Sequence, residues 1–221
     1  MAFLIKDYTT QARRRILVID HAIPEDMGHD LYTYVHQHVL WSFDANEAKN
    51  GDNVQFIHGL DNNLIADSPL WQHLERYITK FFGSGYMPYN CSINHTRVGD
   101  SPLEHRDTYD ESAQDISLLL YLNSHWNLNF SGETVYFDEK GEIELSVLPK
   151  FLRLAIHEGY IRHASRPPTP ICAKSRYTLA IKATPEAVYR THKISEDQVP
   201  EEENHAASLE QAIFGQTRPS A

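Results

Sequence analysis

The sequence predicts an α+β fold, in which two N-terminal helices support one face of an antiparallel β-sandwich or barrel. Two stretches before residue 85 have apolar residues at helical spacing, and several short segments after it are apolar or alternating, as strands are. Turn-forming residues separate those segments, for example at 138–141 and 166–170. Helices followed by a run of strands are typical of a helix-supported antiparallel architecture.

The first helix is expected to begin near Pro24, after a short apolar strand at 15–20. Proline suits the first turn of a helix, and the acids at 25 and 26 favour the positive end of its dipole. The predicted inward face repeats at every fourth position: Met27, Leu31, Val35 and Val39. We expect the three histidines of this region on the surface or the helix flank: His29, His36 and His38.

Residues 45–67 turn polar and contain Asn-Gly-Asp-Asn at 50–53, which predicts a loop of the kind that often covers a site. Ser68 then reads as an N-cap and Pro69 as the first helical residue of a second helix. Glycines at 83 and 85 are expected to end it. Its apolar stripe is predicted to be core, Trp71 included: Leu70, Trp71, Leu74, Tyr77, Ile78 and Phe81.

Six segments in the second half of the chain read as strands: 89–96, 116–123, 134–137, 143–148, 152–157 and 177–183. The segment 116–123 is an almost continuous apolar run, which predicts a strand that is buried on both faces. After Pro185 the pattern dissolves into an acidic stretch. We expect residues 186–221 to form a peripheral or disordered tail without chemistry, beside one domain over residues 1–185.

Composition excludes several classes of function. A net charge of −10 argues against a nucleic-acid partner, which would require clustered Lys and Arg. No apolar run has membrane-spanning length, and residues 1–5 are too few for the apolar part of a signal peptide. Cys91 and Cys172 are far apart, so neither a disulfide framework nor a zinc knuckle is indicated. We expect a cytoplasmic protein without a membrane partner; oligomeric state is not predicted.

A metal site is the chemistry that the sequence suggests. His105 and Asp107 are two residues apart on a stretch that we expect to be extended, so both side chains face the same side, as two arms of a metal clamp. A third ligand has to come from far along the chain. If it is a second histidine, two neutral imidazoles and one carboxylate leave three positions of an octahedral Fe(II) open. His105-Arg106-Asp107 also matches the start of a kinase catalytic loop, but Ser112 stands where that loop needs asparagine, and no glycine-rich phosphate loop exists.

Further motifs follow this pair in a fixed order: Leu120-Tyr121-Leu122-Asn123, Trp126, Ser131-Gly132, Pro149-Lys150-Phe151, Arg153-Leu154, His163, Pro167 and Arg176-Tyr177. With them, residues 89–183 resemble the Fe(II)- and 2-oxoglutarate-dependent dioxygenases of the prolyl 4-hydroxylase group, especially the hypoxia-type prolyl hydroxylases. The resemblance implies a double-stranded β-helix, or jelly-roll, core over residues 86–185, with helical support over 1–85. It also implies the use of Fe(II), 2-oxoglutarate and O2.

The resemblance assigns roles to particular residues. His105, Asp107 and His163 correspond to the iron ligands, and His157 is the alternative to His163. Arg176 corresponds to the arginine that holds the distal carboxylate of 2-oxoglutarate through two parallel hydrogen bonds. Two hydroxyl groups are expected to assist it. Thr178 shares its strand face, and Tyr121 matches a family tyrosine that reaches the same carboxylate.

On the substrate side, the candidate residues are Arg97, Tyr109 and Trp126, with packing as the favoured role of Trp126. Arg106 is a further candidate, for which a structural ion pair is the alternative. Three features depart from the family. His157 stands where the family has a buried apolar residue. The interval from His163 to Arg176 is long, and His95-Thr96-Arg97 stands where the family commonly has a tyrosine. These departures leave the substrate open more than the chemistry.

The implied reaction is hydroxylation of an unactivated C–H bond, with release of succinate and CO2. Proline, free or in a peptide or protein, is the favoured substrate, and another amino acid or a small metabolite is the alternative. Two other classes stay open at this stage. One is a catalytically silent jelly-roll binding module, and the other is a cupin-like oxygenase that does not need 2-oxoglutarate.

Overall fold

The computed structural model describes residues 3–43, 55–100 and 102–189, and in this part of the chain the strands form two antiparallel sheets. The larger sheet has the spatial order β1 (Phe3–Thr9), β2 (Arg15–Asp20), β9 (Leu154–Glu158), β6 (Ile116–Tyr121), β11 (Arg176–Pro185), β5 (Tyr86–Thr96), β4 (Phe56–Leu60) and β3 (Ser42–Phe43). The smaller sheet has the order β10 (His163–Ser165), β7 (Thr134–Phe137) and β8 (Ile143–Val147).

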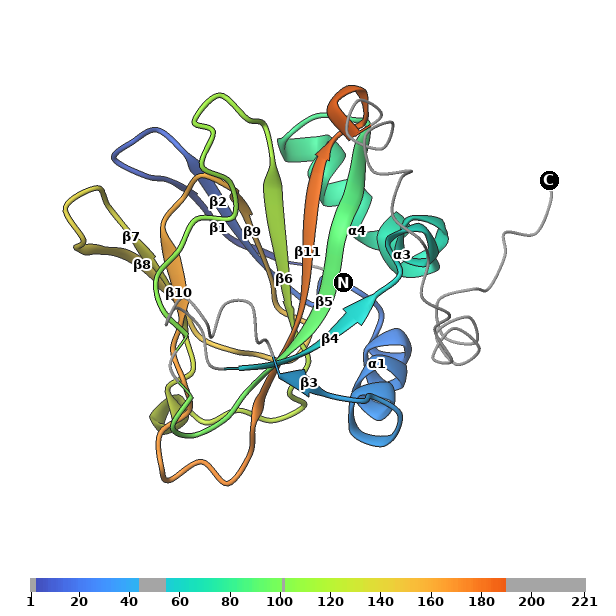
Figure 1. The fold of residues 1–221 in the computed structure, drawn as a ribbon, viewed down its shortest axis with the longest axis vertical. Coiled ribbons are helices and arrows are strands. Elements are labelled where there is room, and N and C mark those ends of the chain that lie inside the picture. Colours follow the sequence, from blue (N-terminus) through green and yellow to red (C-terminus); the bar gives the residue numbers. More distant parts are fainter. Residues whose placement is uncertain (1–2, 44–54, 101, 190–221) are drawn as a thin grey trace.

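Helices cover one face of the larger sheet, and the smaller sheet lies on the other side (Figure 1). The helices are α1 (Glu25–Gln37), α3 (Asn62–Asp67) and α4 (Pro69–Phe81). Leu118 of β6 and Ile181 of β11 belong to the core cluster that includes the helices. Their neighbours Leu119 and Ala180 face the opposite way and pack with residues of β7 and β8. Polar side chains two or four residues from Leu119 or Ala180 lie on the same strand face and therefore point into the space between the sheets.

Several predictions from the sequence are confirmed. Strands β2 and β7 have the predicted bounds, and every residue of β6 is buried. Helix α1 begins directly after Pro24, with both acids in its first turn. Helix α4 begins after Ser68, whose hydroxyl accepts a hydrogen bond from the Trp71 N–H at 3.1 Å. Trp71 is buried in the core, as expected of a packing residue.

The predicted loop at 45–67 is wrong from Phe56 onward, because this part forms β4 and α3. Strand β4 pairs with β5 and buries His58 and Leu60 against the sheet. The acid and amides that suggested a turn start a helix instead, since the Asp61 carboxylate accepts hydrogen bonds from the N–H groups of Asn63 and Leu64. Residues 44–54 of the predicted loop lie outside the described residues.

Four further elements were also not anticipated, namely β1, β3, β10 and the 3-10 helix η1 (Leu128–Phe130). Strand β1 extends the larger sheet by pairing with β2, and β10 pairs with β7 over three residues. Most of the predicted acidic tail, from residue 190 onward, lies outside the described residues.

None of the described helices combines the length and the apolar character that a membrane span requires.

Candidate metal and co-substrate site

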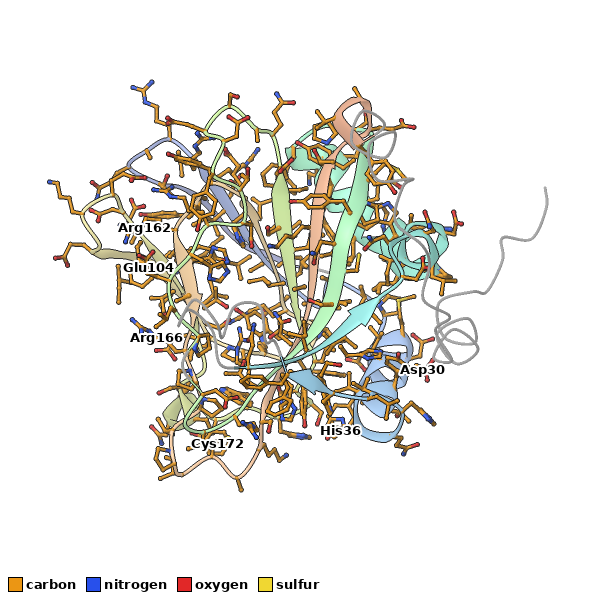
Figure 2. The ribbon with its side chains drawn as sticks, viewed as in Figure 1. Asp30, His36, Glu104, Arg162, Arg166 and Cys172 are labelled. Atoms are coloured by element: carbon orange, nitrogen blue, oxygen red, sulfur yellow. The ribbon has the colours of Figure 1, made fainter. Side chains whose placement is uncertain are left out.

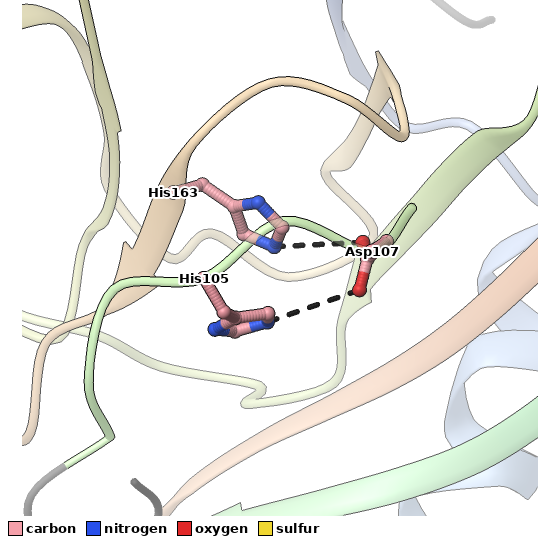
Figure 3. Close-up of side chains that lie close together, drawn as sticks. All are labelled: His105, Asp107 and His163. Carbon is pink, nitrogen blue, oxygen red and sulfur yellow. Dashed lines mark ion pairs between the residues drawn. The ribbon is translucent and has the colours of Figure 1, made fainter. Parts of the chain in front are cut away.

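Two segments that are far apart in the sequence bring three candidate ligands together between the sheets (Figure 3). His105 Nε2 lies 3.8 Å from Asp107 Oδ1, and His163 Nε2 lies 3.6 Å from Asp107 Oδ2. All three ligand atoms are within 4.8 Å of one another. Ligands about 2.1 Å from one ion and at right angles to each other are about 3 Å apart, so a small contraction suffices to bind a metal ion. Two imidazoles and one carboxylate suit a non-haem Fe(II) centre with open positions.

Backbone carbonyls orient both histidines toward the metal position. His105 Nδ1 is 3.1 Å from the Leu103 carbonyl, and His163 Nδ1 is 3.0 Å from the Ile161 carbonyl. A carbonyl only accepts hydrogen bonds, so each Nδ1 carries the proton. Each Nε2 therefore presents its lone pair toward Asp107, as a metal ligand must.

The predicted extended stretch around His105 is not a strand, and a local bridge holds it in place. His105 and His163 exchange backbone hydrogen bonds of 2.9 Å, so the bridge joins two ligands directly. Next to them, the Glu104 carboxylate accepts two hydrogen bonds from the Arg162 guanidinium (Figure 2). The backbone bridge between His105 and His163, rather than a regular strand, thus places their two imidazoles beside each other.

Arg106 faces away from the two ligands beside it. Its guanidinium lies 4.1 Å from the centre of the Tyr160 ring, donates to the Tyr160 carbonyl and forms an ion pair with Glu139 at 2.8 Å. The expected structural ion pair of Arg106 is present.

Asp107 is fixed by groups besides the two histidines. Its Oδ2 accepts a hydrogen bond of 2.6 Å from the Ser117 hydroxyl, and its Oδ1 lies 2.9 Å from Lys182 Nζ. Burial alone would raise the pKa of Asp107, but the positive charge of Lys182 favours the ionised form, and the pKa of Asp107 is held well below its usual value. The carboxylate is therefore ionised and ready to bind a cation.

His163 is kept neutral by its surroundings. Burial, together with His157 and His105, lowers the pKa of His163 to about 3. His157, the alternative ligand, is fully buried in the same cluster, with Nε2 at 3.5 Å from Asp107 Oδ2. The group of convergent ligand atoms nevertheless consists of His105, Asp107 and His163. His157 lies beside that group, next to the Asp107 carboxylate.

Arg176 lies fully buried at the start of β11. Its Nε donates to the Gly132 carbonyl at 2.7 Å and its Nη2 to the Thr134 hydroxyl at 2.9 Å. Nη1 has no hydrogen-bond partner among the described residues, and no carboxylate there forms an ion pair with the guanidinium. Burial lowers the pKa of Arg176 from its usual value, which indicates that the charge is poorly compensated. An unpaired buried guanidinium suits an anionic ligand.

The two hydroxyl groups expected near Arg176 are present. Tyr121 places its ring 5.2 Å from the Arg176 guanidinium, and its hydroxyl donates to Thr134 at 2.7 Å. Thr178 is buried, and its hydroxyl has no hydrogen-bond partner in the described part of the chain. Arg176 Nη1 and Thr178 Oγ1 therefore offer two unused donors on one strand face, which fits the distal carboxylate of 2-oxoglutarate.

A cavity of about 370 Å³ opens over the metal ligands. Its wall includes His105, Asp107 and His163, and it extends along the inner faces of β11, β5 and β4. The polar residues of the wall are Gln55, Asn62, Tyr89, Asn90, Ser92, Asn94, Ser117, Ser165 and Lys182. This size suits one amino acid or one residue of a peptide.

The three residues expected on the substrate side do not line this cavity. Arg97 pairs with Asp100 at 3.0 Å and lies over the Phe56 ring. The Tyr109 side chain is 80% exposed. Trp126 donates from its ring N–H to the Ser131 carbonyl and packs beside Gly132, near Arg176. Trp126 thus has the packing role that the sequence favoured.

Sequence reasoning missed two residues that contact Asp107. Ser117 lies on the same face of β6 as Leu119 and Tyr121. Lys182 lies on the same face of β11 as Ala180, Thr178 and Arg176. Strand periodicity could have found Lys182, because residues 176 and 182 lie an even number of positions apart and so share one strand face.

Comparison with known proteins gives matches in structure only. No model of a known protein family matches the sequence, and no curated protein matches it. A Pseudomonas putida prolyl-4-hydroxylase superposes with a TM-score of 0.58 at 20% identity, over 79% of this chain and 94% of that one.

Two further structures are similar. The Trichoplax adhaerens prolyl hydroxylase, solved with a peptide fragment of the hypoxia inducible factor oxygen degradation domain, has a TM-score of 0.60 at 16% identity, over 78% of this chain and 84% of that one. A viral collagen prolyl hydroxylase of Paramecium Bursaria Chlorella virus-1, solved with 2-oxoglutarate, gives 0.54 at 11% identity, over 76% and 96%. The resemblance seen in the sequence is therefore confirmed as a shared fold: the chain has the fold of the prolyl hydroxylase-like 2-oxoglutarate and Fe(II) oxygenases.

Proposed function

We propose that the protein is an Fe(II)- and 2-oxoglutarate-dependent dioxygenase that hydroxylates an unactivated C–H bond and releases succinate and CO2. The observation that carries this proposal is that two candidate sites lie between the two sheets. One is the convergent His105, Asp107 and His163 group, and the other is the buried Arg176 with an unused donor. We also infer that the two sheets form a double-stranded β-helix, as the similar structures support.

The residues of this chain would bind and orient the reactants. His105, Asp107 and His163 would hold Fe(II), which supplies O2 activation when 2-oxoglutarate is bound. Arg176 would hold the distal carboxylate through two parallel hydrogen bonds, assisted by the Thr178 hydroxyl and, when it turns away from Thr134, by the Tyr121 hydroxyl. Ser117 and Lys182 keep Asp107 ionised and oriented. Burial of Arg176 and His163 excludes water from the inner end of the site.

Proline, free or within a peptide or protein, is the proposed substrate because similar structures include prolyl hydroxylases, one of them with a peptide bound. The metal chemistry does not depend on this choice, so another amino acid is the alternative. The low cysteine content supports a cytoplasmic location as part of the proposal.

Ligand-induced stabilisation tests the co-factor assignment without a known substrate. Under anaerobic conditions, Fe(II) and then 2-oxoglutarate should each raise the melting temperature, because a ligand at 100 times its Kd adds about 2.7 kcal/mol to the stability of the native state. Asp107→Ala should lose both shifts, whereas Asp67→Ala, a change of an exposed carboxylate on α3, should keep them.

Turnover then tests the reaction. In air, wild-type protein with Fe(II) and 2-oxoglutarate should form succinate, and mass spectrometry of a proline-containing substrate pool should find a gain of one oxygen. A wild-type protein that gains no stability from Fe(II) and 2-oxoglutarate, and forms no succinate, would contradict the proposed function.

A further inference from the structure

Lys182 brings a cation into the cavity over the metal ligands. It lies on the same face of β11 as Arg176 and Thr178, six residues beyond the arginine, and its Nζ is 2.9 Å from Asp107 Oδ1. The side chain remains 32% exposed, whereas that of Asp107 is 5% exposed. An ammonium group has three N–H donors, and Asp107 uses one of them. The exposed part of the ammonium faces the cavity whose wall includes it.

Charge is unevenly distributed over this wall. Among the described residues that line the cavity, Asp107 is the only carboxylate and Lys182 is the only Lys or Arg. Asp107 is committed to the metal. Lys182 therefore carries the one side-chain charge that remains for a substrate.

The other lining residues favour a polar guest. Lys182 pairs across the strands with Asn90 of β5 and Ser117 of β6, and amide side chains continue along the wall at Asn94 and Asn62. Tyr89 is the only aromatic residue among the described lining residues apart from the two histidines. Such a surface offers hydrogen bonds to a small polar molecule, and little area for an apolar ring.

The formal charges of the loaded centre explain why a cation is needed there. Fe(II) contributes two positive charges, Asp107 one negative charge and 2-oxoglutarate two negative charges, so the centre is left with one negative charge. That charge repels an acid. Lys182 cancels it, and its two free donors can then bind a carboxylate beside the metal position.

We propose that Lys182 is a specificity-determining residue that binds a carboxylate of the substrate next to the C–H bond to be oxidised. The carboxylate belongs either to a free amino acid or to an acidic residue beside the target residue in a peptide. The inference rests on the proposed function and narrows its substrate class to acids.

Binding of matched acid and amide probes tests this assignment. Under anaerobic conditions, protein loaded with Fe(II) and 2-oxoglutarate is titrated by calorimetry, so that no turnover is needed. Each of the twenty common L-amino acids is compared with its primary amide, and acetyl-Asp-Pro-amide is compared with acetyl-Asn-Pro-amide. We expect at least one acid to bind at least tenfold more tightly than its amide. The first set detects a free amino acid as the source of the carboxylate, and the second detects a peptide.

Variants assign the preference to the lysine. Lys182→Met should abolish the preference for the acid, Lys182→Arg should retain most of it, and Lys140→Met, in an exposed turn, should leave it unchanged. The inference is wrong if no acid binds more tightly than its amide, or if Lys182→Met keeps the preference. It is also wrong if Lys182→Met weakens Fe(II) or 2-oxoglutarate binding as much as acid binding, since the lysine would then serve only Asp107. If the wild type does not bind 2-oxoglutarate at all, that result would instead contradict the proposed function.

Discussion

Arg176 combines complete burial with an incomplete set of partners. Its guanidinium makes two hydrogen bonds inside the protein, and Nη1 has none among the described residues. Burying a charge without a counter-charge destabilises the folded state unless a ligand supplies one. The arginine is therefore better explained by binding than by stability.

Arg176→Lys should separate charge from geometry. Lysine keeps the positive charge but cannot form two parallel hydrogen bonds to a carboxylate. A hydrogen bond to a charged group contributes about 1.5–3 kcal/mol, so we expect the Kd for 2-oxoglutarate to rise roughly 10- to 100-fold. Calorimetry with Mn(II) in place of Fe(II) measures this Kd, and Mn(II) affinity itself should stay unchanged. A Kd within twofold of the wild type would remove Arg176 from the co-substrate site.

Ser117→Ala tests the support of the metal ligand. The Ser117 hydroxyl donates to Asp107 Oδ2 at 2.6 Å, and the residue is buried on β6. Partners of metal ligands typically contribute about 10- to 100-fold in affinity. We expect Fe(II) affinity to fall by about tenfold, with 2-oxoglutarate contacts at Arg176 intact. Ser146→Ala, an exposed position on β8, is the matched control and should bind Fe(II) as the wild type does.

At the scale of single residues, the candidate ligands His105 and Asp107 could be named from their spacing, and His163 from the resemblance of the motifs around it. Ser117 and Lys182 belong to no such motif, and only the strand register places them beside Asp107. For the same reason, Arg97 and Tyr109 could be named from their neighbours in sequence but not located in space.

At the scale of elements, strong local signals gave the correct first residues of two elements. Ser68-Pro69 predicted the start of α4, and the apolar run at 116–123 predicted β6. The polar segment before α4 failed, because β4 is defined by its pairing with β5 rather than by its own composition. Strand β10 is only three residues long and depends on β7 in the same way. Short strands are set by their neighbours, which a single sequence does not reveal.

Ser68→Ala tests how two helices share one residue. The Ser68 hydroxyl accepts from the Trp71 N–H at the start of α4 and donates to the Ile65 carbonyl at the end of α3. Ser68 is fully buried, so the Trp71 N–H loses its partner when the hydroxyl is removed, whereas the Ile65 carbonyl keeps the hydrogen bond from the Ser68 N–H. Loss of an N-cap costs about 1 kcal/mol, and we expect a decrease of about 1–2 kcal/mol in the free energy of unfolding. Urea denaturation measures it, and an unchanged midpoint would contradict the shared cap.

At the scale of the whole molecule, the two sheets make the site possible. The smaller sheet supplies His163 through β10, and the larger sheet supplies Arg176, Thr178 and Lys182 through β11. Both depend on the packing of the sheets around Leu119 and Tyr136. A metal ion would be held by His163 of β10 and by His105 and Asp107 of the segment bridged to it. Protonation of His163 opposes both folding and metal binding, so stability and metal affinity should respond together to pH.

The metal-free protein should lose stability as the solution becomes acidic. The pKa of His163 is about 3 in the folded protein, against 6.5 for the free side chain, so below pH 6.5 the unfolded chain gains a proton that the folded chain does not. This contribution to stability is fully present above pH 6.5 and is lost as the pH falls toward 3. Between pH 6.5 and 5 the expected loss from this group is up to about 2 kcal/mol. Asp107, with its lowered pKa, adds a further loss below pH 3.8.

Urea denaturation at several pH values, with a chelator present, measures this dependence. The comparison is between the wild type and His163→Asn, which lacks the titrating imidazole but leaves the other carboxylates and histidines in place. As the pH falls from 7 to 5, we expect the unfolding free energy of the wild type to decrease more than that of the variant. Parallel pH profiles would show that His163 titrates alike in the folded and unfolded chains, and would contradict its burial as a neutral ligand.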